Sequence, residues 1–362
     1  MRTFPSAAAG AAALLTIGLA ACGGDSSSDS ASSSAKALSG SITGAGATFP
    51  QPVYTEWGAN LKAQGLTVNY QGIGSGGGIA QFTAGTVDFG ATDSAMDDDE
   101  VKAAQAKGEP VHVPSVFGAV TISYNISGVD TGLKLDGETA ADIFLGKIKK
   151  WNDEAIAGQN SGVTLPATDI TVCHRSDESG TTKLFTTFLA AYSSAWEKGP
   201  GVDKSVDWPT GTGAKGNDGV AACVKQTDGA VGYVEQAYAL QNNFTFASLK
   251  NKAGQYVEPS LDSTSAAGDG VDVPEDLRFS AINAPGDAAY PIASATFLLV
   301  YQDLCKAGLA EDTAKNVKVW LDYALGDGQH VAEQLGYAPL PDSILTQSQA
   351  KVASLQCNGA AL

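Results

Sequence analysis

A strand-to-helix turn is encoded by RSDESGTT, residues 175–182. Residues 169–172, DITV, indicate the end of a strand before it, and residues 183–192, KLFTTFLAAY, have the apolar spacing of a helix after it. Ser179 then stands at the N-cap, so Ser179, Gly180 and Thr181 present free backbone N–H groups and two hydroxyls. Such a helix end attracts anions, and the planar guanidinium of Arg175 suits a tetrahedral oxyanion. Taken alone, the stretch fits an ordinary capped helix beside a surface arginine equally well.

Three further segments combine glycine with hydroxyl or acidic residues next to predicted strands. In the first, small residues lead into Thr48, and Pro50 falls near the first position of a helix, where proline is favoured. In the second, Ser75 lies in a glycine-rich turn between a strand and a short helical run, and in the third Asp93 ends a strand. Each could be an ordinary turn, but together with Arg175 they indicate one site. The segments are GAGATFP (44–50), GIGSGGG (72–78) and DFGATD (88–93).

The glycine-rich turn at 72–78 is not a known nucleotide-binding loop. No Gly-Lys-Ser/Thr follows it, which excludes a Walker A loop. Its glycine spacing also differs from the dinucleotide fingerprint, although Asp93 lies near the distance of the acidic partner.

Short strands alternate with helices along the chain, the pattern of an α/β architecture. After the N-terminal region, roughly 320 residues are too many for one simple core and suit two lobes. Residues 251–276, rich in Ser, Asp, Gly and Ala, are expected to form a long surface excursion. Strands are predicted at 66–70, 87–91, 120–124, 170–173, 230–234 and 296–301, and helices at 53–63, 79–82, 97–106, 140–145, 182–192, 219–225, 314–325 and 343–355.

The N-terminus has the features of an exported lipoprotein. Arg2 is followed by a run of small and apolar residues at 7–21, and Leu-Ala-Ala-Cys22 places a cysteine directly after a small-residue cleavage site. The run is too short for a comfortable membrane span. We therefore predict a signal peptide at 1–21, a lipidated Cys22 and a flexible Ser/Ala-rich tether over 22–38. The body would be held outside the cytoplasm, on the outer face of the cell membrane or in the periplasm. The alternative is a plain secretory signal.

The charge of the chain limits its partners. The net charge is −17 and the pI is near 4.4. This argues against nucleic acid, and against an anionic membrane surface, so the membrane is expected to be reached through the lipid only. An anion site in such a chain must use local dipoles, neutral donors and a single arginine, and 42 glycines fit the use of backbone N–H groups.

The order of the motifs resembles the phosphate-binding proteins of the bacterial ABC-type phosphate uptake system. The likeness runs from about Gly40 to Asp342 and rests on GAGATFP, NYQGIGSGGG, VDFGATD, DGETAADIFLGKIKKWND, RSDESGTT, GNDGVAACV, GAVGYVE and LPDS. It implies a type II periplasmic-binding-protein-like α/β fold, with two lobes joined by a hinge and the ligand in the cleft. Lobe 1 would comprise 39–117 plus 291–362, and lobe 2 would comprise 118–290.

The resemblance also implies a ligand, a set of ligand-binding residues and a partner. Inorganic phosphate would be captured and delivered to the transmembrane subunits of an ABC permease. Phe49 and Gly180 would bind through their backbone N–H groups. The phosphate-binding residues would be Thr48, Phe49, Ser75, Asp93, Arg175, Ser179, Gly180 and Thr181.

Two positions depart from the commonest form of the family pattern. Glu178 stands where glycine is frequent, and Gly76 stands where a second serine is frequent. We expect Glu178 to point to solvent at the helix start, where a carboxylate suits the helix dipole.

Asp93 carries the expected selectivity. Phosphate at neutral pH keeps a proton that it can donate to a carboxylate, whereas sulfate has none. Asp93 would therefore accept a hydrogen bond from phosphate and reject sulfate by charge and by an unpaired acceptor. Alternative roles for Asp93 are an ion pair with Arg175 or a strand-end cap.

The cysteines are expected to form two disulfides. Apart from Cys22 the chain has Cys173, Cys223, Cys305 and Cys357, which allow three pairings in an exported protein. The lobe layout favours Cys173–Cys223 and Cys305–Cys357, because each pair then lies within one lobe. No Cys or His spacing suggests a metal, and no cofactor is expected.

An enzyme is not expected. Asp93-Ser94-Ala95 resembles the nucleophile segment of alkaline phosphatases, but that chemistry needs several metal ions, and His112, His174 and His330 lack ligand spacing. No GxSxG elbow is present for a serine hydrolase. Two alternatives stay open: a binding protein for another tetrahedral oxyanion or a phosphorylated metabolite, and an adhesin whose anion site is incidental.

Overall fold

The computed structural model describes residues 38–362 of the chain. A ten-stranded sheet forms the centre of this part. The predicted signal peptide, Cys22 and all but the last residue of the predicted tether lie outside these residues. The main strand order is β2-β1-β3-β13-β4-β8-β6-β7. These strands are β1 (Gly40–Gly46), β2 (Leu66–Gly72), β3 (Phe89–Thr92), β4 (Pro110–Asn125), β6 (Thr171–Arg175), β7 (Thr212–Ala214), β8 (Ala230–Glu235) and β13 (Ile292–Tyr301). The two remaining strands lie off this order: β9 (Thr245–Phe246) pairs with β4, and β12 (Ala281–Ile282) pairs with β13.

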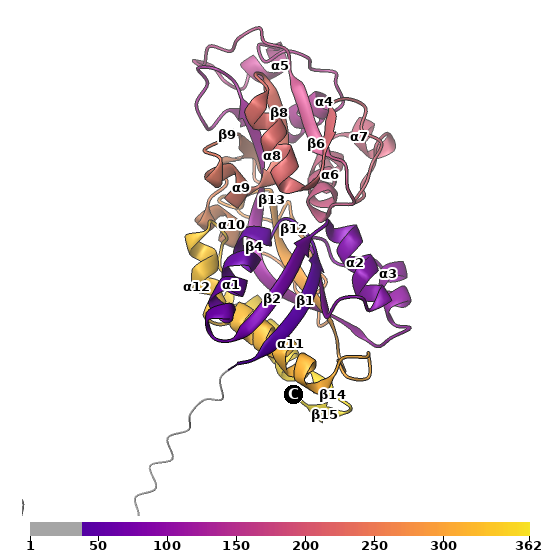
Figure 1. Cartoon of the computed structure of the whole chain (residues 1–362). Helices are drawn as coiled ribbons and strands as arrows, with labels where there is room; N and C mark the ends of the chain where they lie inside the picture. Colours follow the sequence, from indigo (N-terminus) through magenta and orange to yellow (C-terminus); the bar gives the residue numbers. More distant parts are fainter. Residues whose placement is uncertain (1–37) are drawn as a thin grey trace, which may run out of the picture. The chain divides into compact units, whose positions relative to one another are not determined.

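Strand β4 belongs to both halves of this sheet. From Pro110 to Ala119 it pairs antiparallel with β13, and from Val120 to Asn125 it pairs antiparallel with β8. In Figure 1, β1, β2, α1, α2, α3 and α11 lie around one end of the body, and β6, β8, α4, α6, α7 and α8 lie around the other. The single strand β4 therefore joins the two halves of the sheet without a break.

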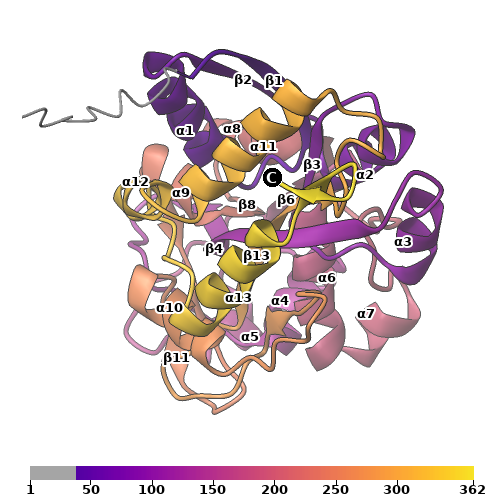
Figure 2. The ribbon, with the colours of Figure 1, turned by 90° about the horizontal axis from the view of Figure 1, so that it is seen from below.

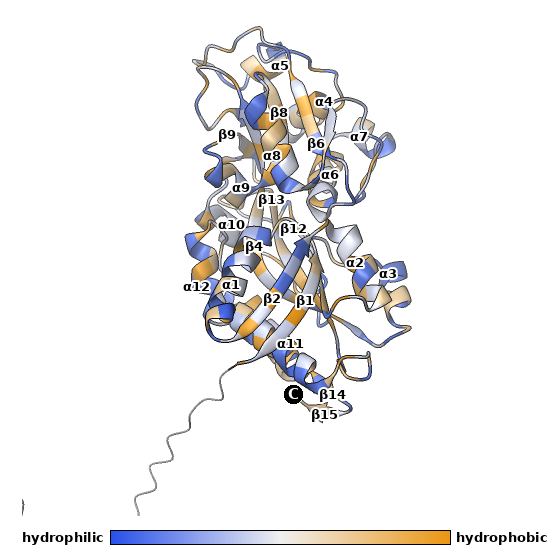
Figure 3. Ribbon diagram, in the orientation of Figure 1, coloured by the Kyte–Doolittle hydropathy of each residue, from blue (hydrophilic) through white to orange (hydrophobic). Residues whose placement is uncertain are grey.

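Helices cover both halves of the sheet. On one half, α11 packs against β1 and α13 packs against β4 (Figure 2). Figure 3 shows hydrophobic stretches along β1 and β6 and hydrophilic stretches on α3 and α7. The helices are α1 (Gln51–Ala63), α2 (Ser75–Ala84), α3 (Asp98–Ala104), α4 (Gly137–Phe144), α5 (Glu154–Ala157), α6 (Gly180–Tyr192), α7 (Ser194–Lys198), α8 (Gly216–Gln226), α9 (Gln236–Gln241), α10 (Leu261–Asp269), α11 (Glu311–Ala324), α12 (Gly328–Gln334) and α13 (Asp342–Ala353).

The predicted strands are all present, and the predicted helices differ mainly at their ends. The largest difference is α2, which begins at Ser75 rather than at residue 79. The glycines at its start serve close packing, because a Cβ on Gly78 would lie 2.4 Å from the Cα of Gly46. The predicted helix start at residue 79 was therefore wrong, and the turn between strand and helix comprises only residues 73 and 74.

The expected surface excursion at 251–276 contains a packed helix. Helix α10 begins with a capping box between Ser260 and Ser263, and its Ala267 is fully buried. Its Gly268 lies so close to Pro341 that a Cβ would come within 2.6 Å of the proline ring. The prediction was wrong for α10, where serine caps the helix and glycine permits close packing, whereas residues 252–255 and 274–276 are exposed as expected.

Two disulfides join the expected cysteines. Cys173 on β6 is bonded to Cys223 on α8, and Cys305 is bonded to Cys357 near the C-terminus. The first bond joins the middle of β6 to the helix beside it. Among residues 38–362, no helix is long and apolar enough to span a membrane.

Candidate functional site

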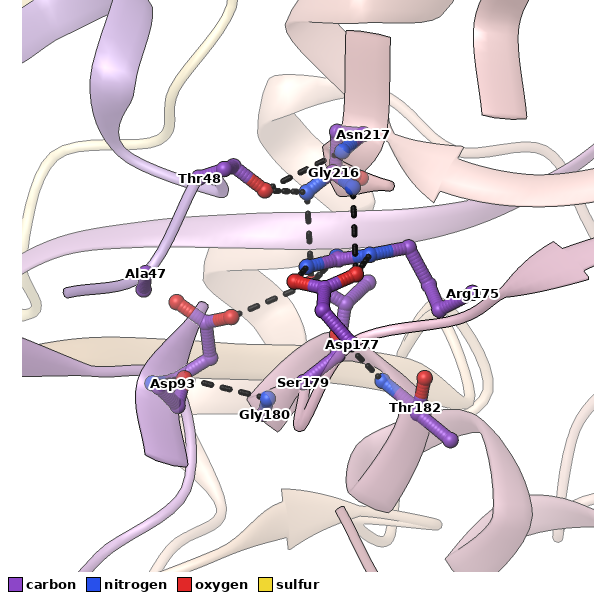
Figure 4. A network of polar contacts seen from close by, with 12 residues as sticks. Ala47, Thr48, Asp93, Arg175, Asp177, Ser179, Gly180, Thr182, Gly216 and Asn217 are labelled. Carbon is purple, nitrogen blue, oxygen red and sulfur yellow. Dashed lines mark hydrogen bonds and ion pairs between the residues drawn. The ribbon is translucent and has the colours of Figure 1, made fainter. Parts of the chain in front are cut away.

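The predicted turns meet at the carboxyl ends of four strands. Thr48 follows β1, Ser75 begins α2 after β2, Asp93 follows β3, and Arg175 is the last residue of β6. Parallel strands of α/β sheets present ligand-binding groups at this edge. Figure 4 shows Thr48, Asp93, Arg175 and the start of α6 facing one another.

Ser179 is the N-cap of α6, as the sequence predicts. It has extended backbone angles, φ −118° and ψ 125°, and its hydroxyl oxygen accepts a hydrogen bond of 3.1 Å from the N–H of Thr182. The next N–H, that of Gly180, donates to Ser75 Oγ at 3.0 Å. Ser75 Oγ also accepts from the N–H of Asp93 at 3.3 Å, so its own proton points elsewhere.

Arg175 is buried and held by an acidic residue, Asp177, that was not among the predicted site residues. Asp177 accepts hydrogen bonds from Arg175 Nε at 2.7 Å and from Nη2 at 2.5 Å. The burial of Asp177 opposes ionisation, but the hydrogen bonds and charge of Arg175 outweigh it and lower the pKa of Asp177. Burial likewise opposes the charge of Arg175, and Asp177 reverses this and raises the pKa of the guanidinium. Arg175 is thus a fixed cation, and the remaining Nη1 donates to Thr181 Oγ1 at 3.4 Å.

Asp93 is 1% exposed and accepts hydrogen bonds from two threonine hydroxyls. Thr296 on β13 donates to Oδ1 at 3.0 Å, and Thr181 donates to Oδ2 at 3.1 Å. Burial raises the pKa of Asp93 to about 6, although these hydrogen bonds and the charge of Arg175 lower it. Arg175 is paired with Asp177, so the alternative of an Asp93–Arg175 ion pair is wrong.

Thr48 and Phe49 lie where the two halves of the sheet meet. Thr48 Oγ1 accepts a hydrogen bond from Asn217 Nδ2 at 2.9 Å and another from the Asn217 N–H at 3.1 Å. The Phe49 ring is fully buried, and its carbonyl accepts a hydrogen bond of 2.7 Å from the hydroxyl of Tyr337. Asn217, at the start of α8, was absent from the predicted set, although GNDG belongs to the resembling motifs.

Glycines allow the opposed segments to touch. A Cβ on Gly180 would lie 2.6 Å from Ser75 Oγ and 2.9 Å from the backbone N of Asp93. Glu178 is exposed, as expected, and its side chain covers Gly76, where a Cβ would meet the Glu178 carboxylate at 2.0 Å. The two departures from the family pattern therefore lie in direct contact.

The site holds hydroxyls, backbone N–H groups, one arginine and two aspartates, a set suited to an oxyanion rather than to a metal. Within residues 38–362, no group of three His, Cys, Asp or Glu side chains is placed to hold a metal ion.

Comparison with known proteins agrees with this arrangement. Residues 30–327 match the family model described as a PBP superfamily domain. The phosphate-binding protein PstS of Pasteurella multocida is 44% identical over 314 residues, covering 86% of this chain and 89% of that protein. PstS of Haemophilus influenzae is also 44% identical, covering 86% of this chain and 92% of its own.

The chain belongs to the PstS family. PstS proteins bind a ligand and are not enzymes, as the sequence predicts. A human phosphate-binding apolipoprotein has the same fold, with a TM-score of 0.71 at 23% identity, covering 88% of this chain and 99% of that one. The predicted periplasmic-binding-protein-like fold is therefore confirmed.

Proposed function

We propose that this protein captures inorganic phosphate outside the cytoplasm and delivers it to an ABC permease. The observation that carries the proposal is that a buried, hydrogen-bonded Asp93 and a buried Arg175 lie in one site together with hydroxyls and backbone N–H groups. The names of the relatives agree with it.

The chemistry of these groups matches a partly protonated tetrahedral anion. The hydroxyls of Thr48 and Ser75, the start of α6 and Arg175 provide donors for phosphate oxygens. The Thr181 hydroxyl, which donates to Asp93 in the structure, joins them when the proton of phosphate takes its place on Asp93. Ser179 and the N–H groups of Phe49 and Gly180 complete the proposed set of phosphate-binding residues. Asp93 is the acceptor for the proton that phosphate carries. Sulfate offers no such proton, and its oxygen beside the buried carboxylate leaves two acceptors facing each other.

Three direct contacts support closure of two bodies around the anion, with 39–117 and 291–362 as one and 118–290 as the other. They are Ser75 with Gly180, Thr48 with Asn217, and Asp93 with Thr181. Hinge closure that forms contacts on both sides of a ligand stabilises the closed form. β4 is the proposed pivot, because it pairs in both halves.

Calorimetric titration of residues 38–362 with phosphate and with sulfate tests the function. We expect tight phosphate binding and sulfate binding at least about 10⁴-fold weaker. Asp93→Asn should reduce this ratio, because its amide donates to sulfate. Asp88→Asn is the matched control, since the Asp88 carboxylate accepts from the N–H and hydroxyl of Thr43 away from the site. An absence of binding heat for both anions would refute the phosphate-binding function. An unchanged ratio of phosphate to sulfate affinity in Asp93→Asn would refute the role of Asp93 in selectivity.

The anchor and the partner complete the proposal. Cys22 would be lipidated after removal of residues 1–21, holding the body at the outer face of the cell membrane or in the periplasm. Metabolic labelling with a radioactive fatty acid should mark the wild-type protein and leave Cys22→Ser unlabelled. Crosslinking of the phosphate-loaded protein to the transmembrane subunits of the permease tests the delivery step.

A further inference from the structure

Asn217 links two of the predicted site residues, Thr48 and Thr181, to the backbone of Glu235. It is fully buried at the second position of α8. Its Nδ2 donates to Thr48 Oγ1 at 2.9 Å and to Thr181 Oγ1 at 3.3 Å, and its backbone N–H donates to Thr48 Oγ1 at 3.1 Å. Its Oδ1 accepts from the N–H of Glu235 at 2.9 Å.

The orientation of the Asn217 amide is fixed by the backbone. A flipped amide would point its NH₂ group at the N–H of Glu235 and its oxygen at Thr48. Two donors would then face each other in a fully buried position, which is costly. The donors of Asn217 are therefore held toward Thr48.

The two hydrogen bonds from Asn217 determine the direction of the Thr48 proton. A threonine hydroxyl has one proton to donate and two lone pairs to accept with. Both lone pairs of Thr48 Oγ1 are taken by N–H groups of Asn217. The hydroxyl proton must then point to an acceptor elsewhere.

We infer that Asn217 is a positioning residue that makes the Thr48 hydroxyl a hydrogen-bond donor to the bound anion and fastens the closed form of the site. The inference rests on the proposed function, with phosphate as the anion. Thr48 belongs to the proposed body 39–117, and Asn217 belongs to 118–290. The bonds between them form when the two bodies meet, so their loss raises the rate at which phosphate leaves.

Two substitutions separate this role from general stability. Asn217→Ala removes three side-chain hydrogen bonds, and we expect phosphate binding about ten- to a hundredfold weaker, mostly through faster dissociation. Asn217→Asp keeps the shape but places a carboxylate oxygen beside Thr48, which draws the hydroxyl proton away from the anion. Asn217→Asp should therefore bind phosphate more weakly than Asn217→Ala.

The Thr48→Val background isolates the effect on the hydroxyl. In that background Asn217→Ala should change the phosphate dissociation rate far less than it does in the wild type, because no hydroxyl remains to orient. Asn160→Ala is the matched control. Asn160 is a buried asparagine that bonds the backbone of Lys134 and Ile156 away from the site. Asn160→Ala should lower the melting temperature and leave the phosphate dissociation rate unchanged.

The inference is tested by measuring, for the wild type and each variant, the phosphate dissociation rate by stopped flow, the phosphate affinity by calorimetry and the melting temperature. A wild-type phosphate dissociation rate in Asn217→Ala would overturn the inference. So would an effect of Asn217→Ala on that rate that is equally large in the wild-type and Thr48→Val backgrounds. A wild-type protein that binds no phosphate would refute the proposed function instead, so the two failures are distinct.

Discussion

Gly180→Ala is expected to weaken phosphate binding without harming the fold. The added Cβ would lie 2.6 Å from Ser75 Oγ, 2.8 Å from Asp93 Cβ and 2.9 Å from Asp93 N. The last two groups lie on or beside the backbone and cannot swing away, so the closed arrangement must widen. Overpacking of this kind typically costs about 1–3 kcal/mol. The phosphate affinity should fall about 5- to 150-fold, at about 1.4 kcal/mol for each tenfold step.

The same substitution should leave the phosphate-free protein intact. Gly180 belongs to the proposed body 118–290 and the groups it touches belong to 39–117, so hinge opening relieves the strain. Calorimetry and thermal melting with and without phosphate measure both quantities. Gly219→Ala on α8 is the control, because its Cβ would meet no atom nearer than 3.4 Å. Wild-type affinity in Gly180→Ala would show that the contact is not needed. A large fall in melting temperature without phosphate would show that the two bodies do not part.

Three further outcomes follow from the charged groups. Burial raises the pKa of Asp93 to about 6, so the group takes up a proton on folding between about pH 4 and 6, and its stabilising effect is lost as the pH rises through 6. The free energy of unfolding of the wild type relative to Asp93→Asn, measured in urea without phosphate, should rise by about 2 kcal/mol from pH 7 to pH 4; a constant difference would contradict this. Asp177→Ala leaves the charge of Arg175 buried without its partner, and the free energy of unfolding should fall by about 3–5 kcal/mol. A loss below about 1 kcal/mol in urea denaturation would show that other groups compensate the charge. Lys204 Nζ lies 2.5 Å from Glu100 Oε1 and joins the two proposed bodies beside the site. Lys204→Met should speed phosphate dissociation about two- to fivefold, and less at high salt, as stopped-flow measurements can check; equal rates would show that the ion pair plays no part in closure.

Periodicity predicted most of the sheet but missed β1. Its sequence, GSITGAG, lacks a run of β-branched residues. Its glycines are needed because a Cβ on Gly44 would lie 2.1 Å from the Phe89 ring, and one on Gly46 would lie 2.0 Å from the carbonyl oxygen of Ala91. Local propensity understates such a strand, since close packing between neighbouring strands stabilises it.

The motif residues were predictable, whereas the residues that orient them were not. Thr296 donates to Asp93 from the middle of the apolar strand β13, where sequence patterns indicate only burial. Asn217 begins a helix, and asparagine there gives the same signal as an ordinary helix start. Asp177 lies two residues after Arg175, and only its hydrogen bonds show that it neutralises the guanidinium. These roles depend on contacts between distant segments, which one sequence does not reveal.

The Arg175–Asp177 ion pair bears on how phosphate binding responds to dissolved salt. Because the pair is neutral as a unit and the other donors are uncharged, no net positive charge at the site offsets the repulsion between the anion and a body of charge −17. Dissolved salt screens that repulsion, so both the association rate and the affinity for phosphate should rise with ionic strength. In a brackish medium phosphate would therefore reach the site faster, and be bound more tightly, than in fresh water.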